Sequence, residues 1–231
     1  MNPPPVPNGD ADALERLLST RHSCRGFLSN PVDDALIERI LRIAQRTPSW
    51  CNAQPWRTII TKGGATDRFR NALCEHVAET AAAPDIAFPR EYHGVYLERR
   101  RECGFQLYEA VGVARGDRQA YSRQMFENYR LFGAPHVAIV TSDEALGAYG
   151  AVDCGAYVNN FLLAAQSLGV ASIPQAALAS HSKFIRDYFG LGADRVVVCG
   201  ISFGIEDRAD KANAFRTSRA ALQDTVTLEG E

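Results

Sequence analysis

Several familiar signatures are missing from this sequence of 231 residues. Its first ten residues, MNPPPVPNGD, lack the basic and apolar regions of a signal peptide. No apolar run approaches the roughly 18 residues of a membrane-spanning helix. The formal net charge is only −2, so the basic surface typical of a nucleic-acid-binding protein is missing as well. We therefore expect a cytoplasmic protein that binds neither membranes nor nucleic acids.

Metal-ligating residues are few and dispersed. The six cysteines form no C-x-x-C pair and the five histidines form no H-E-x-x-H motif, so neither a zinc site nor an iron–sulfur cluster is indicated. We expect six free thiols, most of them buried, and no metal. Cys51 and Cys154 have no neighbour in the sequence that would mark either one as a nucleophile.

Common catalytic and nucleotide-binding motifs are absent or incomplete. The sequence contains neither G-x-G-x-x-G nor G-x-x-x-x-G-K-[ST], so neither a Rossmann dinucleotide site nor a P-loop is indicated. The stretch GISFG at 200–204 matches the G-x-S-x-G motif of hydrolases. That motif requires a helix after the serine and a histidine later in the chain, whereas no histidine follows His181. A hydrolase is therefore rejected.

The composition, with 46% hydrophobic and 23% charged residues, is that of an ordinary globular protein. We expect a disordered tail over residues 1–10 and a single domain over residues 11–231. Strands and helices alternate at long intervals, which predicts an α+β fold with helices covering a small mixed sheet. The periodicity predicts helices at residues 11–20, 33–46, 65–83, 118–132, 150–169 and 183–189, and strands at 57–61, 136–142, 170–173 and 195–204.

Two segments depart from this regular pattern. Residues 84–120 are rich in arginine and aromatic residues, and we expect an insertion of irregular chain followed by one or two exposed helices. Residues 206–231 are polar and predict a C-terminal arm with little regular structure.

The sequence RHSCR gathers donors of hydrogen bonds. It places Arg21, His22, Ser23 and Arg25 within five residues, directly after a predicted helix. Arginine binds phosphate through paired hydrogen bonds, and serine and histidine add further donors. A solvated basic turn explains the same residues equally well.

Both tryptophans of the chain lie in the stretch PSWCNAQPW at 48–56. Asn52 and Gln54 are in a loop bounded by prolines, where their amides can bind the polar edge of a ring while Trp50 covers its face. Trp56 enters a predicted strand, so we expect it to be a core residue.

Two further segments carry a weaker signal. Residues 172–177 (SIPQAA) lie at a strand end, where successive main-chain N–H groups can face a ligand. The stretch FRTSR at 215–219 adds Arg216 and Arg219 to a tail that otherwise resembles coil. Neither segment alone identifies a ligand.

In their order along the chain, these segments resemble the FMN-dependent NAD(P)H nitroreductase family of the oxygen-insensitive type. The likeness extends from Leu14 to Arg219, and residues 89–135 are most similar to nitrobenzoate-type reductases. It implies a nitroreductase-like α+β fold, with a small, mixed and mostly antiparallel sheet covered by helices, in an intertwined homodimer. The segments that carry it are RHSCRGF (21–27), PVDDALIERILRIAQRTPSWCNAQPW (31–56), FENYRLFGAPHVAIV (126–140), NNFLLAAQSLGVASIPQ (159–175) and RTSR (216–219).

The resemblance implies bound FMN, with NAD(P)H as electron donor. Arg21 and Ser23 would hold the FMN phosphate and ribityl chain, and Arg216 and Arg219 would close on the phosphate from the tail. Arg25 would lie by the N1/O2 edge of the flavin, where a fixed cation stabilises the charge of the reduced ring.

The remaining flavin contacts implied by the resemblance come from three places. Ser49, Trp50 and Asn52 would reach the flavin from the partner subunit. Asn128, with Arg130 as its rival, would contact the polar edge, and Pro174, Gln175 and Ala176 would lie along the ring with a main-chain N–H aimed at N5. The full set of implied cofactor-binding residues is Arg21, His22, Ser23, Arg25, Ser49, Trp50, Asn52, Gln54, Asn128, Pro174, Gln175, Ala176, Arg216 and Arg219.

Two positions depart from the family pattern. The family usually has a small residue where Trp50 stands, so this ring would narrow the pocket or stack on the substrate. A glycine or glutamate is common near Ala176, so a donor to N5 at this place must be main chain.

The activity implied is reduction of nitroaromatic compounds by a ping-pong cycle, in which NAD(P)H and the nitroarene use the flavin in turn. No acid–base residue is evident, and none is required, because solvent can supply protons. We expect residues 88–108 to form a substrate lid. Its candidate substrate contacts, together with Trp50, are Tyr92, Tyr96, Arg99, Arg100 and Phe105, with one of the arginines, Arg101 included, pairing with a substrate carboxylate.

Other activities are possible on the same scaffold. A reductive dehalogenase of the iodotyrosine type would need a lid glutamate followed four residues later by tyrosine, whereas Glu91 is followed by Val95 and Glu98 by Glu102. An enal or quinone reductase, or a flavin-binding protein without catalysis, is compatible with the sequence.

Overall fold

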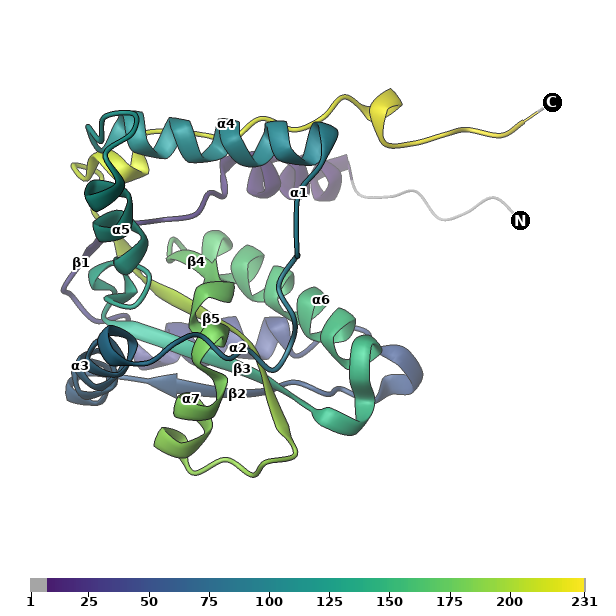
Figure 1. Cartoon of the computed structure of the whole chain (residues 1–231). Coiled ribbons are helices and arrows are strands. Elements are labelled where there is room, and N and C mark those ends of the chain that lie inside the picture. The colour runs from purple at the N-terminus through teal and green to yellow at the C-terminus, as the bar shows by residue number, and fades with distance from the viewer. Residues whose placement is uncertain (1–7, 231) are drawn as a thin grey trace.

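The computed structural model of this chain describes residues 8–230. The predicted tail over 1–10 falls mostly outside the described residues, and the first helix begins at Asn8, three residues before its expected start. The helices are α1 (Asn8–Thr20), α2 (Asp34–Ala44), α3 (Gly64–Glu79), α4 (Gly94–Ala110), α5 (Arg118–Phe126), α6 (Gly147–Ser167) and α7 (Ser182–Phe189) (Figure 1). The strands are β1 (Phe27–Leu28), β2 (Arg57–Thr61), β3 (His136–Asp143), β4 (Ala171–Gln175) and β5 (Arg195–Glu206).

The five strands form one sheet around β5. The order is β1-β5-β3-β2, and β4 also pairs with β5. Every pair of these strands is antiparallel, so the parallel component expected of a mixed sheet is limited to an isolated bridge between Ser23 and Ser172. That bridge matters for the site, because it joins the RHSCR loop to β4.

Alternation along β3 divides the interior into two cores. Ala138 and Val140 face α2 and α6, whereas Val137 and Ile139 face α3 and α7. Successive side chains of a strand point to opposite faces, so one strand supplies both cores. Trp56 is buried against the first core, where its ring stacks on Tyr157, as the sequence predicted for this tryptophan.

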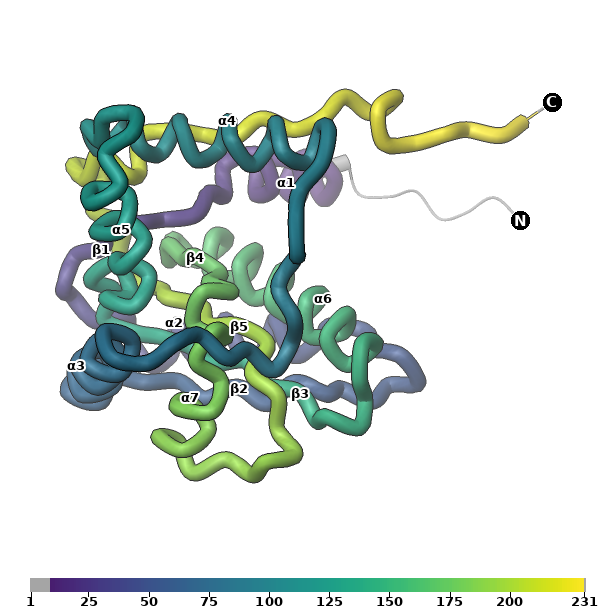
Figure 2. Tube along the Cα trace, in the orientation of Figure 1, coloured from purple at the N-terminus to yellow at the C-terminus, as the bar shows by residue number. Residues whose placement is uncertain are grey.

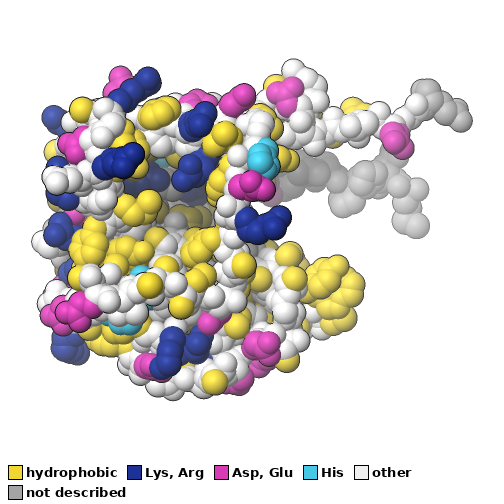
Figure 3. Space-filling view, in the orientation of Figure 1, with side chains coloured by type: hydrophobic (Ala, Val, Ile, Leu, Met, Phe, Trp, Pro, Cys, Tyr) yellow, Lys and Arg dark blue, Asp and Glu magenta, His cyan; other side chains and the backbone are white. Residues whose placement is uncertain are grey.

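An outer layer stands apart from this body. Helices α1 and α4 have no buried residue among those described, and the C-terminal arm runs beside α4 (Figures 1 and 2). Figure 3 shows a hollow between this layer and the body, with basic side chains in its upper wall and hydrophobic side chains over its floor. No helix among residues 8–230 is long and apolar enough to cross a membrane.

Several predicted boundaries move for local reasons. Asp33 is the N-cap of α2, with its carboxylate accepting the N–H of Ala35 at 2.8 Å. Helix α5 ends at Phe126 rather than Phe132 and is followed by a turn over residues 127–130. Leu131 and Phe132, which the prediction included in the helix, adopt left-handed conformations with φ of 57° and 52°.

Strand β4 is longer than expected. It continues through Pro174 and Gln175, which pair with Ile201 and Gly200. Because β4 pairs with β5 alone among the described strands, it is an edge strand, where the missing N–H of a proline is tolerated. The SIPQ segment is therefore strand rather than loop.

Candidate functional site

The RHSCR loop is held against β4 by main-chain contacts. It connects α1 to β1, and the N–H of Cys24 donates to the carbonyl of Ser172 at 3.2 Å. This contact extends the Ser23–Ser172 bridge. Arg21 and Arg25 flank the tethered residues, so their side chains emerge beside the sheet rather than in open solvent.

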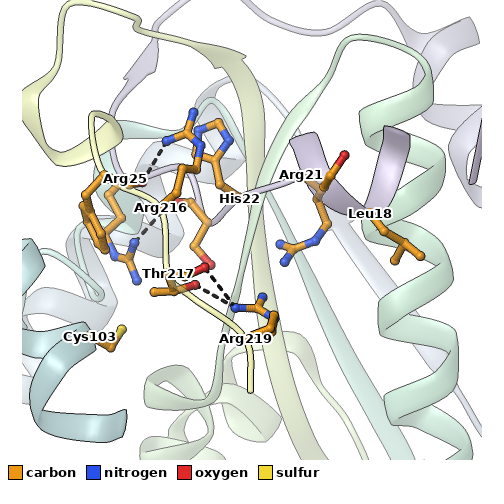
Figure 4. Close-up of a pocket in the computed structure, with 11 residues that line it drawn as sticks. Leu18, Arg21, His22, Arg25, Cys103, Arg216, Thr217 and Arg219 are labelled. Carbon is orange, nitrogen blue, oxygen red and sulfur yellow. Dashed lines mark hydrogen bonds between the residues drawn. The ribbon is translucent and has the colours of Figure 1, made fainter. Parts of the chain in front are cut away.

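A cavity of about 350 Å³ opens beside this loop. Arg21 enters it from the end of α1, and Arg216 and Arg219 enter from the C-terminal arm (Figure 4). Within the described chain, none of the residues lining it is acidic. The lining residues are Leu18, Ser19, Arg21, His22, Ser23, Arg25, Cys103, Phe215, Arg216, Thr217 and Arg219.

The four guanidinium groups of this cavity are not neutralised by carboxylates of the described residues. Burial, followed by the positive charge of Arg219, lowers the pKa of Arg21. Burial also lowers the pKa of Arg25. Arginine nevertheless stays charged in proteins, so the cavity concentrates positive charge that an anion would relieve.

Two of these arginines are already positioned by the arm itself. The guanidinium of Arg216 donates to the carbonyls of Asn213 at 2.7 Å and Phe215 at 2.8 Å. That of Arg219 donates to the Thr217 hydroxyl at 2.9 Å. These bonds use one nitrogen of each fork, leaving the other donors for a ligand.

A second, smaller cavity of about 230 Å³ continues from the first, and Ser23 and Arg25 line both. The guanidinium of Arg25 is held by the carbonyl of Ser23 at 3.2 Å and lies over the Phe215 ring, 5.4 Å from its centroid. The other lining residues come from α4, α5 and β4 and from the segments that follow α5 and β4. They are Leu107, Tyr108, Gln124, Met125, Asn128, Phe132, Ile173, Pro174, Gln175 and Ala176.

The structure distinguishes Asn128 from its rival. Asn128 lines the second cavity, whereas Arg130 lies outside it and pairs with Glu127 at 2.7 Å. The buried amide of Gln175 donates to the Asn128 carbonyl at 2.8 Å and accepts from the Ser202 hydroxyl. Gln175 therefore offers its main chain, rather than its side chain, to a ligand.

His22 lies at the wall of the first cavity but is engaged elsewhere. Its Nε2 contacts the Glu206 carboxylate at 2.9 Å. This contact ties the RHSCR loop to the end of β5, so the imidazole has a partner that the sequence did not indicate.

The tryptophan loop lies apart from both cavities. Trp50 is 64% exposed, its ring is 5.2 Å from that of Tyr149, and its main-chain N–H donates to the Asp153 carboxylate at 3.1 Å. Asn52 and Gln54 adopt φ of 56° and 48°, an unusual conformation outside glycine.

The same loop is braced internally. The hydroxyl of Ser49 accepts the N–H of Gln54 at 2.9 Å, and the Gln54 amide donates to Asn52 Oδ1 at 3.1 Å. A single chain does not bring these residues to the arginine cavity. The predicted contact from a partner subunit is the arrangement that would.

The aromatic lid residues predicted to contact the substrate, Tyr92, Tyr96 and Phe105, do not line either cavity. Tyr92 lies under the Arg100 guanidinium at 5.2 Å, and Phe105 under that of Arg115 at 4.7 Å. Tyr96 is 67% exposed. Arg99 lines a neighbouring cavity of about 540 Å³ between α4 and the arm. The sequence analysis missed five further lining residues on α4 and α5. Only their positions on these helices link them, because their side chains do not form a recognisable motif. They are Cys103, Leu107, Tyr108, Gln124 and Met125.

The G-x-S-x-G match at 200–204 and the cysteine Cys154 do not belong to a catalytic site. Ser202 is fully buried in the middle of β5, not on a turn. Burial raises the pKa of Cys154 to about 11, which leaves it an unreactive thiol. Among the described residues, no three His, Cys, Asp or Glu side chains are grouped to hold a metal ion.

Comparison with known proteins gives a family for this geometry. The model of the nitroreductase family matches residues 18–205. This chain belongs to the nitroreductase family. Nitroreductase NfnB of Mycolicibacterium smegmatis is 35% identical over 232 residues, covering 98% of each chain. The 4-nitrobenzoate reductase of Pseudomonas putida is 29% identical, covering 92% of this chain and 93% of that protein.

Solved structures of family members confirm the fold. The FMN-dependent nitroreductase NfnB of Mycobacterium smegmatis, solved with NADPH, superimposes with a TM-score of 0.91 at 33% identity, covering 95% of this chain and 99% of that one. The FMN- and NADPH-dependent NfnB of Sphingopyxis has a TM-score of 0.90 at 30% identity. The nitroreductase-like α+β fold expected from the sequence is thus confirmed.

Cys103 provides a direct probe of the first cavity. It is half-buried and lines the cavity, whereas burial raises the pKa values of Cys24 and Cys199 to about 12. We expect FMN to slow modification of Cys103 by a thiol reagent several-fold, as followed by peptide mass spectrometry. Cys74, on α3 and outside these cavities, is the control. An unchanged rate at Cys103 would mean that FMN binds elsewhere.

Proposed function

We propose that this chain is an FMN-dependent oxidoreductase that uses NAD(P)H to reduce nitroaromatic compounds. The observation that carries the proposal is the cavity with four guanidinium groups and no acidic lining residue among those described, opening into a second cavity beside β4. The first suits a phosphate and the second a ring. The relatives named as nitroreductases and the structure solved with NADPH support the same reaction.

The residues present fit FMN. Arg21, Arg216 and Arg219 would bind the phosphate through charge-assisted hydrogen bonds, and Ser23 would bind the ribityl chain. Arg25 faces both cavities and would place a cation beside the pyrimidine edge of the ring. When bound, FMN supplies hydride acceptance from NAD(P)H and two-electron transfer to the nitro group. Main chain at Gln175 or Ala176 would supply the donor to N5.

We propose that two copies of the chain complete the site. Helix α6 exposes Tyr149 and Val152, 64% and 65% exposed, beside Trp50. Helix α1 exposes Leu14 and Leu18, about half of each side chain. The rings of Trp50 and Tyr149 lie 5.2 Å apart on this surface, and exposed aromatic residues are enriched at interfaces. A partner covering it would bring its own Ser49, Trp50 and Asn52 toward the arginine cavity.

For the substrate, we propose an arene over the second cavity. Tyr108 and Leu107 of α4 and Gln124 and Met125 of α5 line it, and they replace the exposed lid aromatics as the first candidates for contact. Substrate contacts from Trp50, Tyr92, Tyr96 and Phe105 would require a partner chain or closure of the lid.

Arg99 lines the cavity between α4 and the arm rather than the second cavity, so it would reach the carboxylate of a substrate only when the lid closes. We expect Arg99→Gln to raise KM for 4-nitrobenzoate about fivefold, the size of a partly exposed ion pair, and to leave KM for nitrobenzene unchanged. Arg101→Gln, on the same helix but outside the described cavities, is the matched control. Equal effects on both substrates would refute recognition of the carboxylate.

The function itself is tested by a visible spectrum of the purified protein, followed without oxygen through addition of NADPH and then 4-nitrobenzoate. We expect flavin bands that bleach with NADPH and return with the nitro compound. Bleaching without recovery would retain a flavoenzyme but point to haloarenes, enals or quinones as substrates. Absence of flavin after incubation with FMN would refute the proposal. A cytoplasmic location remains a prediction from the sequence.

A further inference from the structure

A buried asparagine joins the two arginine-bearing segments of the first cavity. Asn213 is 5% exposed and ends the short 3₁₀ helix Lys211–Asn213 in the C-terminal arm. Its Oδ1 accepts the main-chain N–H of Arg25 at 2.6 Å. Its Nδ2 donates to the carbonyls of Gly26 and Asp207, both at 2.9 Å. Both amide protons and the carbonyl are therefore engaged.

The chemistry of these neighbours fixes the orientation of the amide. Arg25 presents an N–H, which needs an acceptor, and the carbonyls of Gly26 and Asp207 need donors, so the amide cannot be reversed. The main-chain carbonyl of Asn213 in turn accepts from the guanidinium of Arg216 at 2.7 Å. One residue thus contacts both the RHSCR loop and an arginine of the arm.

The junction around Asn213 is closely packed. A Cβ added to Gly26 would lie 2.2 Å from the Asp210 carboxylate, so the arm rests directly on the glycine backbone. The same carboxylate accepts the N–H of Ala212 at 2.8 Å, and the N–H of Asp207 donates to Gly26 at 3.0 Å. The arm therefore has little freedom to shift relative to the loop while this network is intact.

We propose that Asn213 is a positioning residue for the phosphate end of the cavity. It holds the RHSCR loop and Arg216 at a fixed separation. Asn213 is absent from the lining of the first and second cavities, although it lines a neighbouring cavity of about 510 Å³ together with Arg216. The inference rests on the proposed function. Loss of the amide leaves the main-chain N–H of Arg25 without its acceptor. The carbonyls of Gly26 and Asp207 lose one donor each but keep the N–H groups of Asp207 and Asp210. The loop and the arm are then no longer joined by this side chain, and one of them must move to satisfy the Arg25 N–H. Affinity should then fall for a phosphorylated flavin in particular.

The test compares FMN with riboflavin, which lacks the phosphate, by titration of the apoprotein with fluorescence detection. We expect Asn213→Ala and Asn213→Asp to weaken FMN binding about tenfold or more, the size of one or two lost hydrogen bonds. Riboflavin binding should weaken much less, because riboflavin keeps only the ring that Arg25 contacts. The aspartate is isosteric but sets an acceptor against the two carbonyls, so it decides the question if the alanine variant does not fold. Leu73→Ala, in the second core, is the control for general destabilisation.

The outcomes separate the two levels of the proposal. Equal loss of FMN and riboflavin would reduce Asn213 to a structural role and overturn the inference, and so would full FMN affinity in a folded variant. A wild-type apoprotein that binds neither flavin would overturn the proposed function and this inference with it. A preference for FMN that is lost in the Asn213 variants and kept in Leu73→Ala would support both.

Discussion

Replacing Arg21 with glutamine is expected to weaken FMN binding by about 10- to 100-fold. A hydrogen bond to a charged group contributes about 1.5–3 kcal/mol, and each 1.4 kcal/mol is a factor of ten in affinity. Arg21 differs from the arginines of the arm because its guanidinium donates to no other described residue. Its hydrogen bonds are thus wholly available to the phosphate, and glutamine restores neither the charge nor the fork.

The measurement is a titration of the apoprotein with FMN at two salt concentrations. Arg118→Gln, on α5 and outside both cavities, is the matched control for loss of one positive charge. The difference in FMN affinity between the two variants should be smaller at high salt, because salt screens the attraction between the arginine and the phosphate. An unchanged affinity of Arg21→Gln for FMN would show that the phosphate does not bind in this cavity.

The sequence identified the charged residues of the site better than the apolar residues that line it. Arg21 and Arg216 are nearly two hundred residues apart, yet their side-chain chemistry marked both, and the structure places both at one cavity. Leu107 and Met125 line the second cavity without any such mark. Apolar residues on exposed helices have the same appearance in a sequence whether they line a pocket or face solvent.

Lid residues show why composition was insufficient. Tyr92 and Tyr96 were plausible arene contacts, but Tyr92 packs under Arg100 and Tyr96 is exposed. Which face of α4 turns toward the cavity depends on how the helix packs against the C-terminal arm. The arm residues that it contacts follow more than a hundred positions later in the chain. Tyr108, on the face that does line the cavity, was therefore indistinguishable from its neighbours.

Asn213 illustrates a different limit. Its importance comes from three main-chain partners, one in the RHSCR loop and one at the residue directly after it, and main-chain groups are identical at every residue. No side-chain motif can therefore reveal it. By contrast, Trp56 was correctly placed in the core, because a large ring at the start of an apolar strand has few alternatives.

The largest effect on the whole assembly is expected from Val152→Glu. Val152 is 65% exposed on α6, so a glutamate there is solvated in a single chain and suits a helix. In the proposed dimer the same carboxylate is buried without a partner. That costs several kcal/mol, roughly a hundredfold or more in the dimer dissociation constant.

We therefore expect Val152→Glu to be a folded monomer by light scattering and circular dichroism. It should also lose most of its FMN, because the Trp50 loop of the partner is no longer beside the cavity. Ala193→Glu adds the same charge to an exposed position in the loop after α7 and should remain dimeric with full flavin. A Val152→Glu protein that stays dimeric would place the interface elsewhere. A monomer that keeps its flavin would mean that the arginine cavity alone binds FMN, and that the exposed Trp50 has another role.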